Sequence, residues 1–324
     1  DPGCLRRMET AALGLSSPGV MENFVRSVES EFAGERPARQ AQVSRPALPE
    51  RDFDPTVLAY LSSDRVVAYA LKATGGKSPE ELAGSPVIET LRYFADGYLV
   101  SGSWRVRNNG VKLVGILRYG QRRDLLLSLV ADRSPAPLIK RLLGADFRQV
   151  GFIRRNALVA LGRLELWDDR LGEVLAGVLQ NDPYFESRSA AAGVILALRA
   201  KIGASPELAR ALEKNLGHRS PEVRWKSLEA LGAVTPDPKL TANLDRFLFH
   251  PNWRIRQALA MAVGHLVERG LVHPGDPLIR QVESIIPTCT DFIPTFPLKR
   301  ELVRMHRLGR GGSGENTTHG ESRP

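Results

Sequence analysis

Apolar residues recur along most of the chain at the spacing of an amphipathic α-helix. Between residues 18 and 33, Val20, Phe24 and Val28 fall at i, i+4 and i+8, and charged residues occupy the other side. From residue 53 to residue 308 the helical spacing continues, without strand-like alternation over a useful length. The pattern predicts a helix at 18–33 and an almost entirely helical chain from 53 to 308.

One motif returns within this helical region. It is an aliphatic residue followed by Arg, with a small residue three positions after the Arg and Gly eight positions after it, as in IRRNALVALGRL from Ile153. An outlying copy opens at Arg65, with Ala68 and Ala73 at the two positions. Four further arginines open full copies: Arg107, Arg154, Arg224 and Arg256. A fifth copy, at Arg188, keeps the small Ala191 but has Leu196 where the Gly should be. Successive arginines lie 32 to 47 residues apart, which is the range of helical repeat arrays.

The spacing predicts which side of each copy is buried. Positions +3, +7 and +10 after the Arg share one side of a helix, and a two-helix hairpin must bury that side against a neighbour. Gly at +8 permits close approach, so we expect Gly162, Gly232 and Gly264 to be buried at helix contacts. The outward positions are then +1, +5 and +9. They are Asn108, Lys112 and Ile116; Arg155, Val159 and Arg163; Ser189, Gly193 and Ala197; Trp225, Glu229 and Ala233; and Gln257, Met261 and His265.

The motif resembles HEAT repeats, particularly the short bacterial type also found in phycobilin-lyase-like proteins, whose second helix opens with Val-Arg and continues to Ala-Leu-Gly. The resemblance covers residues 100–270 well and 53–100 poorly. It implies an all-α fold, an α-solenoid of stacked HEAT-like helical hairpins whose second helices line the concave face. It also implies a structural ladder in which an Asp or Asn stands six residues before the Arg. Only Asp182 fits that position, and His218 and His250 occupy it in two other copies.

Composition marks the ends of the expected solenoid. Residues 1–50 combine the predicted helix with a proline-containing linker at 34–50, and the solenoid occupies 51–308. Residues 309–324 (GRGGSGENTTHGESRP) are a predicted disordered tail. The sequence lacks the roughly 18 uninterrupted apolar residues of a membrane-spanning helix and the layout of a signal peptide. We therefore expect no membrane insertion and a cytoplasmic location.

The charge of the chain is uneven. The net charge is +9, and residues 101–150 hold ten Lys or Arg against three Asp or Glu. A local basic field of this kind attracts an acidic protein or a nucleic acid. It is also compatible with a solvated, salt-bridged helix face.

Motifs of catalysis and metal binding are missing from the sequence. Cys4 and Cys289 form no CxxC or Cys/His spacing, and there is no nucleophile elbow, P-loop or dinucleotide fingerprint. Two histidines without a third ligand make a poor metal site, so His218 and His250 are expected to act in loops or caps. Asp168 and Asp169 are expected to cap a helix. We predict no metal, no cofactor and no catalytic residue.

The sequence favours a non-enzymatic scaffold or adaptor that binds a protein partner, of acidic character, on the concave face of a HEAT-like solenoid. Exposed Trp and Met side chains are typical of contact surfaces. The candidate partner-binding residues are Asn108, Lys112, Arg155, Arg163, Trp225, Glu229, Gln257 and Met261.

Two alternatives stay open. The first is a nucleic-acid-binding solenoid that uses the basic segment 101–155, although few aromatic residues there are suited to base stacking. Its phosphate contacts would come from Lys112, Arg122, Arg123, Lys140, Arg141, Arg148, Arg154 and Arg155. The second alternative is a lyase-type or other enzyme on the same fold.

Overall fold

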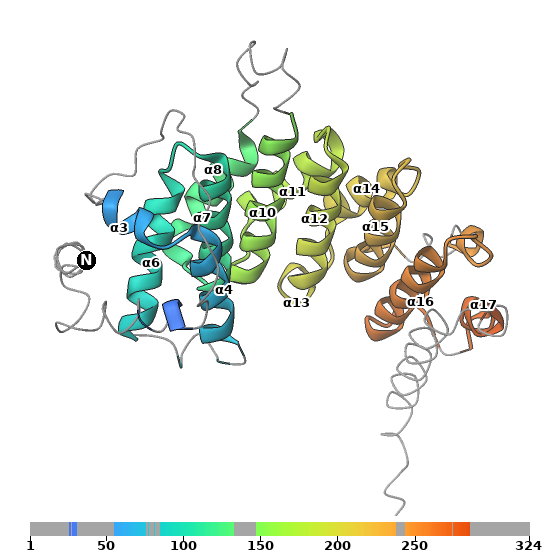
Figure 1. Cartoon of the computed structure of the whole chain (residues 1–324). Coiled ribbons are helices and arrows are strands. Elements are labelled where there is room, and N and C mark those ends of the chain that lie inside the picture. Colours follow the sequence, from blue (N-terminus) through green and yellow to red (C-terminus); the bar gives the residue numbers. More distant parts are fainter. Residues whose placement is uncertain are drawn as a thin grey trace, which may run out of the picture. The chain divides into compact units, whose positions relative to one another are not determined.

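The computed structural model describes residues 26, 28–30, 55–75, 77, 81, 85–132, 147–237, 244–273 and 275–285. All regular elements in these ranges are helices (Figure 1), which confirms the all-α class for the described part of the chain. None of the described helices is both long enough and apolar enough to cross a membrane. The predicted linker at 34–50 and the predicted tail at 309–324 lie outside the described residues.

The chain divides into two compact units, residues 1–166 and 167–324. The first unit contains a buried Val28, in the part of the predicted helix 18–33 that the structure describes as helical. Helix α7 is central to the unit and packs against α4, α6 and α10, while α10 also packs against α8. The elements are α3 (Pro55–Tyr60), α4 (Ser63–Thr74), α6 (Pro86–Leu99), α7 (Trp104–Ile116), η1 (Gly120–Arg122), α8 (Arg123–Ala131) and α10 (Phe147–Leu164).

In the second unit, α15 is the central helix. It packs against α12, α14 and α16, while α11 packs against α12 and α14, and α17 against α16. The elements are α11 (Asp169–Asn181), α12 (Phe185–Ala197), α13 (Arg199–Ile202), α14 (Pro206–Asn215), α15 (Pro221–Val234), η3 (Asp245–Phe247), α16 (Trp253–Glu268) and α17 (Pro277–Ile285).

Short polar side chains set where several of these helices begin. The Asp168 carboxylate accepts a hydrogen bond from the Leu171 N–H at 2.9 Å, and Asn252 accepts one from Arg254 at 3.0 Å. Such N-caps satisfy backbone donors that have no partner within the helix. The predicted capping role of Asp168 is confirmed. Ser220 stands at the N-cap of α15 without a side-chain bond to the helix.

The predicted buried positions are confirmed in five motif copies. Positions +3, +7 and +10 are buried in α7, α10, α12, α15 and α16, or in the residue that follows the helix. The copy at Arg65 differs, because Lys72 at +7 and Gly75 at +10 are exposed. Helix α4 ends at Thr74, so position +10 lies beyond the helix and the buried side does not extend that far.

The motif glycines allow backbones to approach closely. Gly162, Gly232 and Gly264 are buried, as predicted, and so is Gly115. A Cβ atom at Gly115 would lie 2.9 Å from Ala160 Cα, and one at Gly232 would lie 2.6 Å from Ala262 Cα. In both contacts the Gly at +8 meets the Ala at +6 of the next copy. The same helix-to-helix register therefore recurs within each unit.

Candidate functional site

Helices α7 and α10 present a surface without acidic residues. Neither helix contains Asp or Glu. On both helices the side chains at motif positions −2, +1, +5 and +9 are partly or fully exposed. These positions share one side of a helix, and the two helices pack in the recurring register, so the two sets face one side. We call this set the basic face; it comprises Arg105, Asn108, Lys112, Ile116, Phe152, Arg155, Val159 and Arg163.

The α10 half of the basic face alternates apolar and cationic side chains. Phe152 is 41% exposed and Val159 is 37% exposed, which places both among the exposed large apolar residues of the described part of the chain. Arg155 and Arg163 are exposed and lie at helical spacing from them. Sequence reasoning named Arg155 and Arg163 but missed Phe152, although extending the outward spacing by one turn toward the N-terminus would have found it.

Hydrogen bonds hold the α7 half of the basic face in place. The Asn156 amide donates to Asn108 Oδ1 at 2.7 Å and so joins α10 to α7. Lys112 Nζ donates to Asn109 Oδ1 at 3.2 Å, and the buried Asn109 amide donates in turn to Ser63 Oγ at 2.8 Å on α4. Asn108 and Lys112 are therefore positioned by neighbours rather than free in solvent.

Arg154 does not belong to an anion-binding surface. Its side chain is buried, with 3% exposure, and its Nη1 donates to the Asp132 carbonyl at 3.2 Å. The Arg154 side chain therefore packs against the neighbouring backbone, which removes it from the phosphate contacts expected in the nucleic-acid alternative. Arg123 is half-buried at the start of α8. Lys140 and Arg141 lie outside the described residues, and so does the side chain of Arg148.

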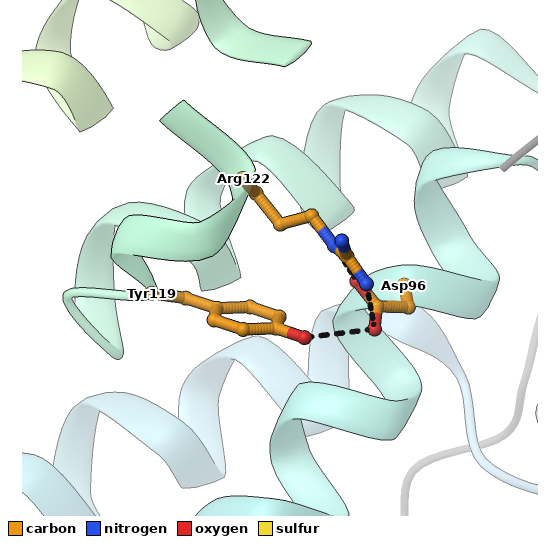
Figure 2. A network of polar contacts seen from close by, with 3 residues as sticks. All are labelled: Asp96, Tyr119 and Arg122. Carbon is orange, nitrogen blue, oxygen red and sulfur yellow. Dashed lines mark hydrogen bonds and ion pairs between the residues drawn. The ribbon is translucent and has the colours of Figure 1, made fainter. Parts of the chain in front are cut away.

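Arg122 is occupied by a buried carboxylate (Figure 2). Asp96 has no exposed surface and accepts hydrogen bonds from Arg122 Nε at 2.6 Å, Arg122 Nη2 at 2.9 Å and Tyr119 Oη at 3.1 Å. This contact with Asp96 is the main cause of the raised pKa of the Arg122 guanidinium. The network ties α6 to η1, so Arg122 has a structural role and is not available for phosphate in this arrangement.

In the second unit the four expected partner-binding residues are partly exposed: Trp225, Glu229, Gln257 and Met261. Lys226 Nζ lies 5.3 Å from the centroid of the Trp225 ring and pairs with Glu222 at 3.0 Å. Acidic residues stand at position −2 of α12 and α15, in Glu186 and Glu222. The acid-free character of the basic face is thus not repeated on these helices.

Three residues predicted to point outward are buried instead: Ser189, Ala233 and His265. Ser189 Oγ donates to Glu222 Oε1 at 2.8 Å, so the neighbouring helix covers it. Arg269 reaches back to the Gly232 carbonyl at 3.4 Å over the last turn of α15, beside Ala233. His265 lies against Glu268, with 3.4 Å between Nδ1 and Oε2. Position +9 is therefore outward only in the earlier copies.

The residues six positions before the motif Arg share one geometry. Asp182 Oδ1, His218 Nδ1 and His250 Nδ1 each accept a hydrogen bond from the backbone N–H two residues later, at 2.9, 3.0 and 3.0 Å. The carbonyls of Asp182 and His250 also accept bonds from Arg188 and Arg256, at 2.7 and 2.6 Å. The loop role predicted for the histidines is confirmed. Burial is the main cause of a lowered pKa in both histidines, and nearby guanidinium groups add to it.

The described residues contain no group of three or more His, Cys, Asp or Glu side chains that could hold a metal ion. No family model and no curated protein matches the chain. Among solved structures, the crystal structure of an engineered protein is 15% identical in sequence, covers 75% of this chain and 97% of its own, and gives a TM-score of 0.39. A similarity at this level assigns neither fold nor function.

Proposed function

We propose that the protein is a non-enzymatic scaffold or adaptor that binds an acidic protein segment on the basic face of its first unit. The observation that carries this proposal is the composition of α7 and α10, two packed helices with basic side chains and no acidic ones. A surface of one sign attracts and orients a partner of the opposite sign.

The apolar side chains of the basic face favour a protein over a nucleic acid. Burying the exposed 41% of a Phe152 side chain of roughly 200 Å² removes about 80 Å² from water, worth about 2 kcal/mol. An acidic helix with one or two apolar residues can cover Phe152 and Val159 while its carboxylates meet Arg155 and Arg163. A phosphate backbone uses the guanidinium groups alone, and Arg122 and Arg154 are engaged elsewhere.

We further propose that α7, α10, α12, α15 and α16 are second helices of HEAT-like hairpins stacked within their units. The recurring contact of Gly at +8 with Ala at +6 supports this, since close stacking of equivalent helices is what a repeat array requires. The buried +3, +7 and +10 positions support it as well. The partner-binding residues would then lie on the inner helices of the stack.

The experiment uses the full chain and three labelled probes in fluorescence anisotropy. They are a helical peptide of Glu with Leu at i and i+4, the same peptide with Ala for Leu, and a 20-nucleotide single-stranded DNA. We expect the Glu/Leu peptide to bind most tightly. Arg155→Glu with Arg163→Glu should weaken its binding by roughly tenfold or more, and Phe152→Ala by a similar factor, through loss of ion pairs and of apolar burial respectively.

The matched control reverses two charges in the second unit, by Arg210→Glu with Arg280→Glu. Both residues are exposed, so this variant has the same net charge without touching the basic face. It should bind the Glu/Leu peptide like the unmodified chain. The proposal fails if DNA binds most tightly, with a steep dependence on salt, and Phe152→Ala has no effect.

A further inference from the structure

The ring of His250 has a defined tautomer. The Asn252 N–H points at His250 Nδ1 from 3.0 Å. A backbone N–H can only donate, so Nδ1 must present its lone pair, and the neutral ring carries its proton on Nε2. The proton position thus follows from the hydrogen bond rather than from an assumption about pH.

The Nε2–H of His250 faces a second donor. Arg224 Nη1 lies 3.3 Å from His250 Nε2, and a guanidinium has no acceptor atom. Two N–H groups at this distance do not bond to each other. An acceptor that reaches both would satisfy the imidazole and the guanidinium together.

Other donors of the same cluster lack acceptors. The Nε atoms of Arg224 and Arg256 are buried without a hydrogen-bond partner in the described part of the chain. In the copy at Arg188 the corresponding Nε donates to the Asp182 carbonyl at 2.7 Å. Burial is the main cause of the lowered pKa of His250, and the guanidiniums of Arg224 on α15 and Arg256 on α16 lower it further. The cluster is therefore cationic and rich in donors.

We propose that Arg224, His250 and Arg256 form an oxyanion-binding site whose ligand is a phosphate group. A phosphate offers several acceptor oxygens, so it can take the Nε2–H of His250 and guanidinium N–H groups at once. Its charge of about −1.5 to −2 at neutral pH matches two guanidiniums better than the single charge of a carboxylate. All three side chains are partly exposed, so a phosphate can approach them from solvent. The Nε atoms of Arg224 and Arg256 are themselves buried, so its contacts would be with the other N–H groups of the cluster.

This site is separate from the basic face and from the acidic segment proposed to bind there. Its residues come from α15, α16 and the loop before α16, all within the second unit. The phosphate group can belong to a free ion or to a phosphorylated molecule, and inorganic phosphate is the simplest probe of the shared chemistry.

The test is thermal unfolding of the full chain at pH 7.5 in sodium phosphate, sodium acetate or sodium chloride of equal ionic strength. We expect a saturable rise in Tm with phosphate at millimolar concentration. At ten times the Kd, the folded form should be favoured about 11-fold over its value without ligand. A rise that is linear and does not saturate would indicate general salting-out instead and count against the site. An equal rise with acetate would overturn the choice of phosphate.

The informative variant is His250→Asp. It places a carboxylate where Asp182 stands in another copy, keeps an acceptor for the Asn252 N–H, and provides Arg224 with an internal anion. We expect the saturable response to phosphate to disappear. His273→Asp is the matched control, because it makes the same change of charge at an exposed residue elsewhere in the second unit. The saturable response to phosphate should persist in this variant. An unchanged response in His250→Asp would exclude this site.

A second measurement does not depend on the folding of a variant. Long-range ¹H–¹⁵N spectra of the imidazole groups in the unmodified chain report the tautomer of each histidine. We expect the Nε2–H form for His250 and a shift of its Nε2 resonance when phosphate is added, with no such shift on adding chloride. An Nδ1–H tautomer, or an Nε2 signal indifferent to phosphate, would refute the proposal.

Discussion

The bond between Arg122 and Asp96 allows a quantitative prediction about stability. We consider Arg122→Met, which removes the guanidinium and keeps an unbranched apolar stem over Tyr119. Asp96 is fully buried and the Arg122 side chain is 26% exposed, so the variant leaves a buried carboxylate without its counter-charge. Removing one partner of a buried ion pair destabilises proteins by about 3–5 kcal/mol.

The lower end of that range applies here. Tyr119 Oη donates to Asp96 at 3.1 Å, and we expect this hydrogen bond to the carboxylate to remain when Arg122 is replaced. We therefore expect about 3 kcal/mol, which corresponds to roughly a 150-fold change in the equilibrium between folded and unfolded forms.

Hydrogen exchange followed by mass spectrometry measures this change. Amides of α6 and α7 that exchange through unfolding of the first unit should exchange roughly 150-fold faster in Arg122→Met. Peptides from α15 report the second unit in the same sample. Arg118→Met is the matched control, because Arg118 pairs with Glu165 at 3.1 Å and the two side chains are 42% and 49% exposed. An exposed pair of this kind contributes at most about 1 kcal/mol.

The double variant Asp96→Asn with Arg122→Met tests the cause. Without a buried charge, it should exchange more slowly than Arg122→Met alone, and the two substitutions should be strongly non-additive. If Arg122→Met exchanges no faster than Arg118→Met, or if the double variant shows the sum of the single effects, then the network does not stabilise the unit in the way described.

Further outcomes follow from the helix contacts and from the histidines. Gly232→Ala should lower the urea midpoint, because a Cβ would lie 2.5 Å from the Ala262 carbonyl oxygen, at a cost of about 1–3 kcal/mol. Gly193→Ala, where a Cβ meets nothing within 4 Å, should leave the midpoint unchanged or raise it, and equal losses in the two variants would show the contact to be absent. The folded-state pKa of His218 and of His250 is lowered below the model-peptide value of 6.5, so the unfolded chain binds more protons near that pH. The contribution of the two histidines to the free energy of unfolding should therefore be fully present above about pH 6.5 and decrease as the pH falls below it. His218→Asn with His250→Asn keeps a side-chain acceptor and should flatten this dependence in thermal unfolding; a slope equal to that of the unmodified chain would assign the effect to other groups.

The amino-acid sequence by itself determined the helical class and the buried side of each motif copy. These depend on spacing within one helix, where residues three, four and seven apart share a side whatever their neighbours are. Ala157, Leu161 and Leu164 are buried for this reason, and the motif Gly predicted the close contacts at Gly115 and Gly232. The loop role of His218 and His250 was also accessible, because a shared position six residues before the Arg implies a shared geometry.

Only the tertiary structure decided which polar residues are available for binding. Arg122 and Arg155 are equally basic, yet the Asp96 carboxylate of another helix engages Arg122 while Arg155 is exposed. The contacts of Asp96 with Arg122 and of Asn109 with Ser63 join residues 26 and 46 positions apart. Such partners depend on how separate helices pack, and helix spacing within one segment has no information about them. The basic face could not be predicted from either helix alone, because it requires α7 and α10 to pack side by side in a common register.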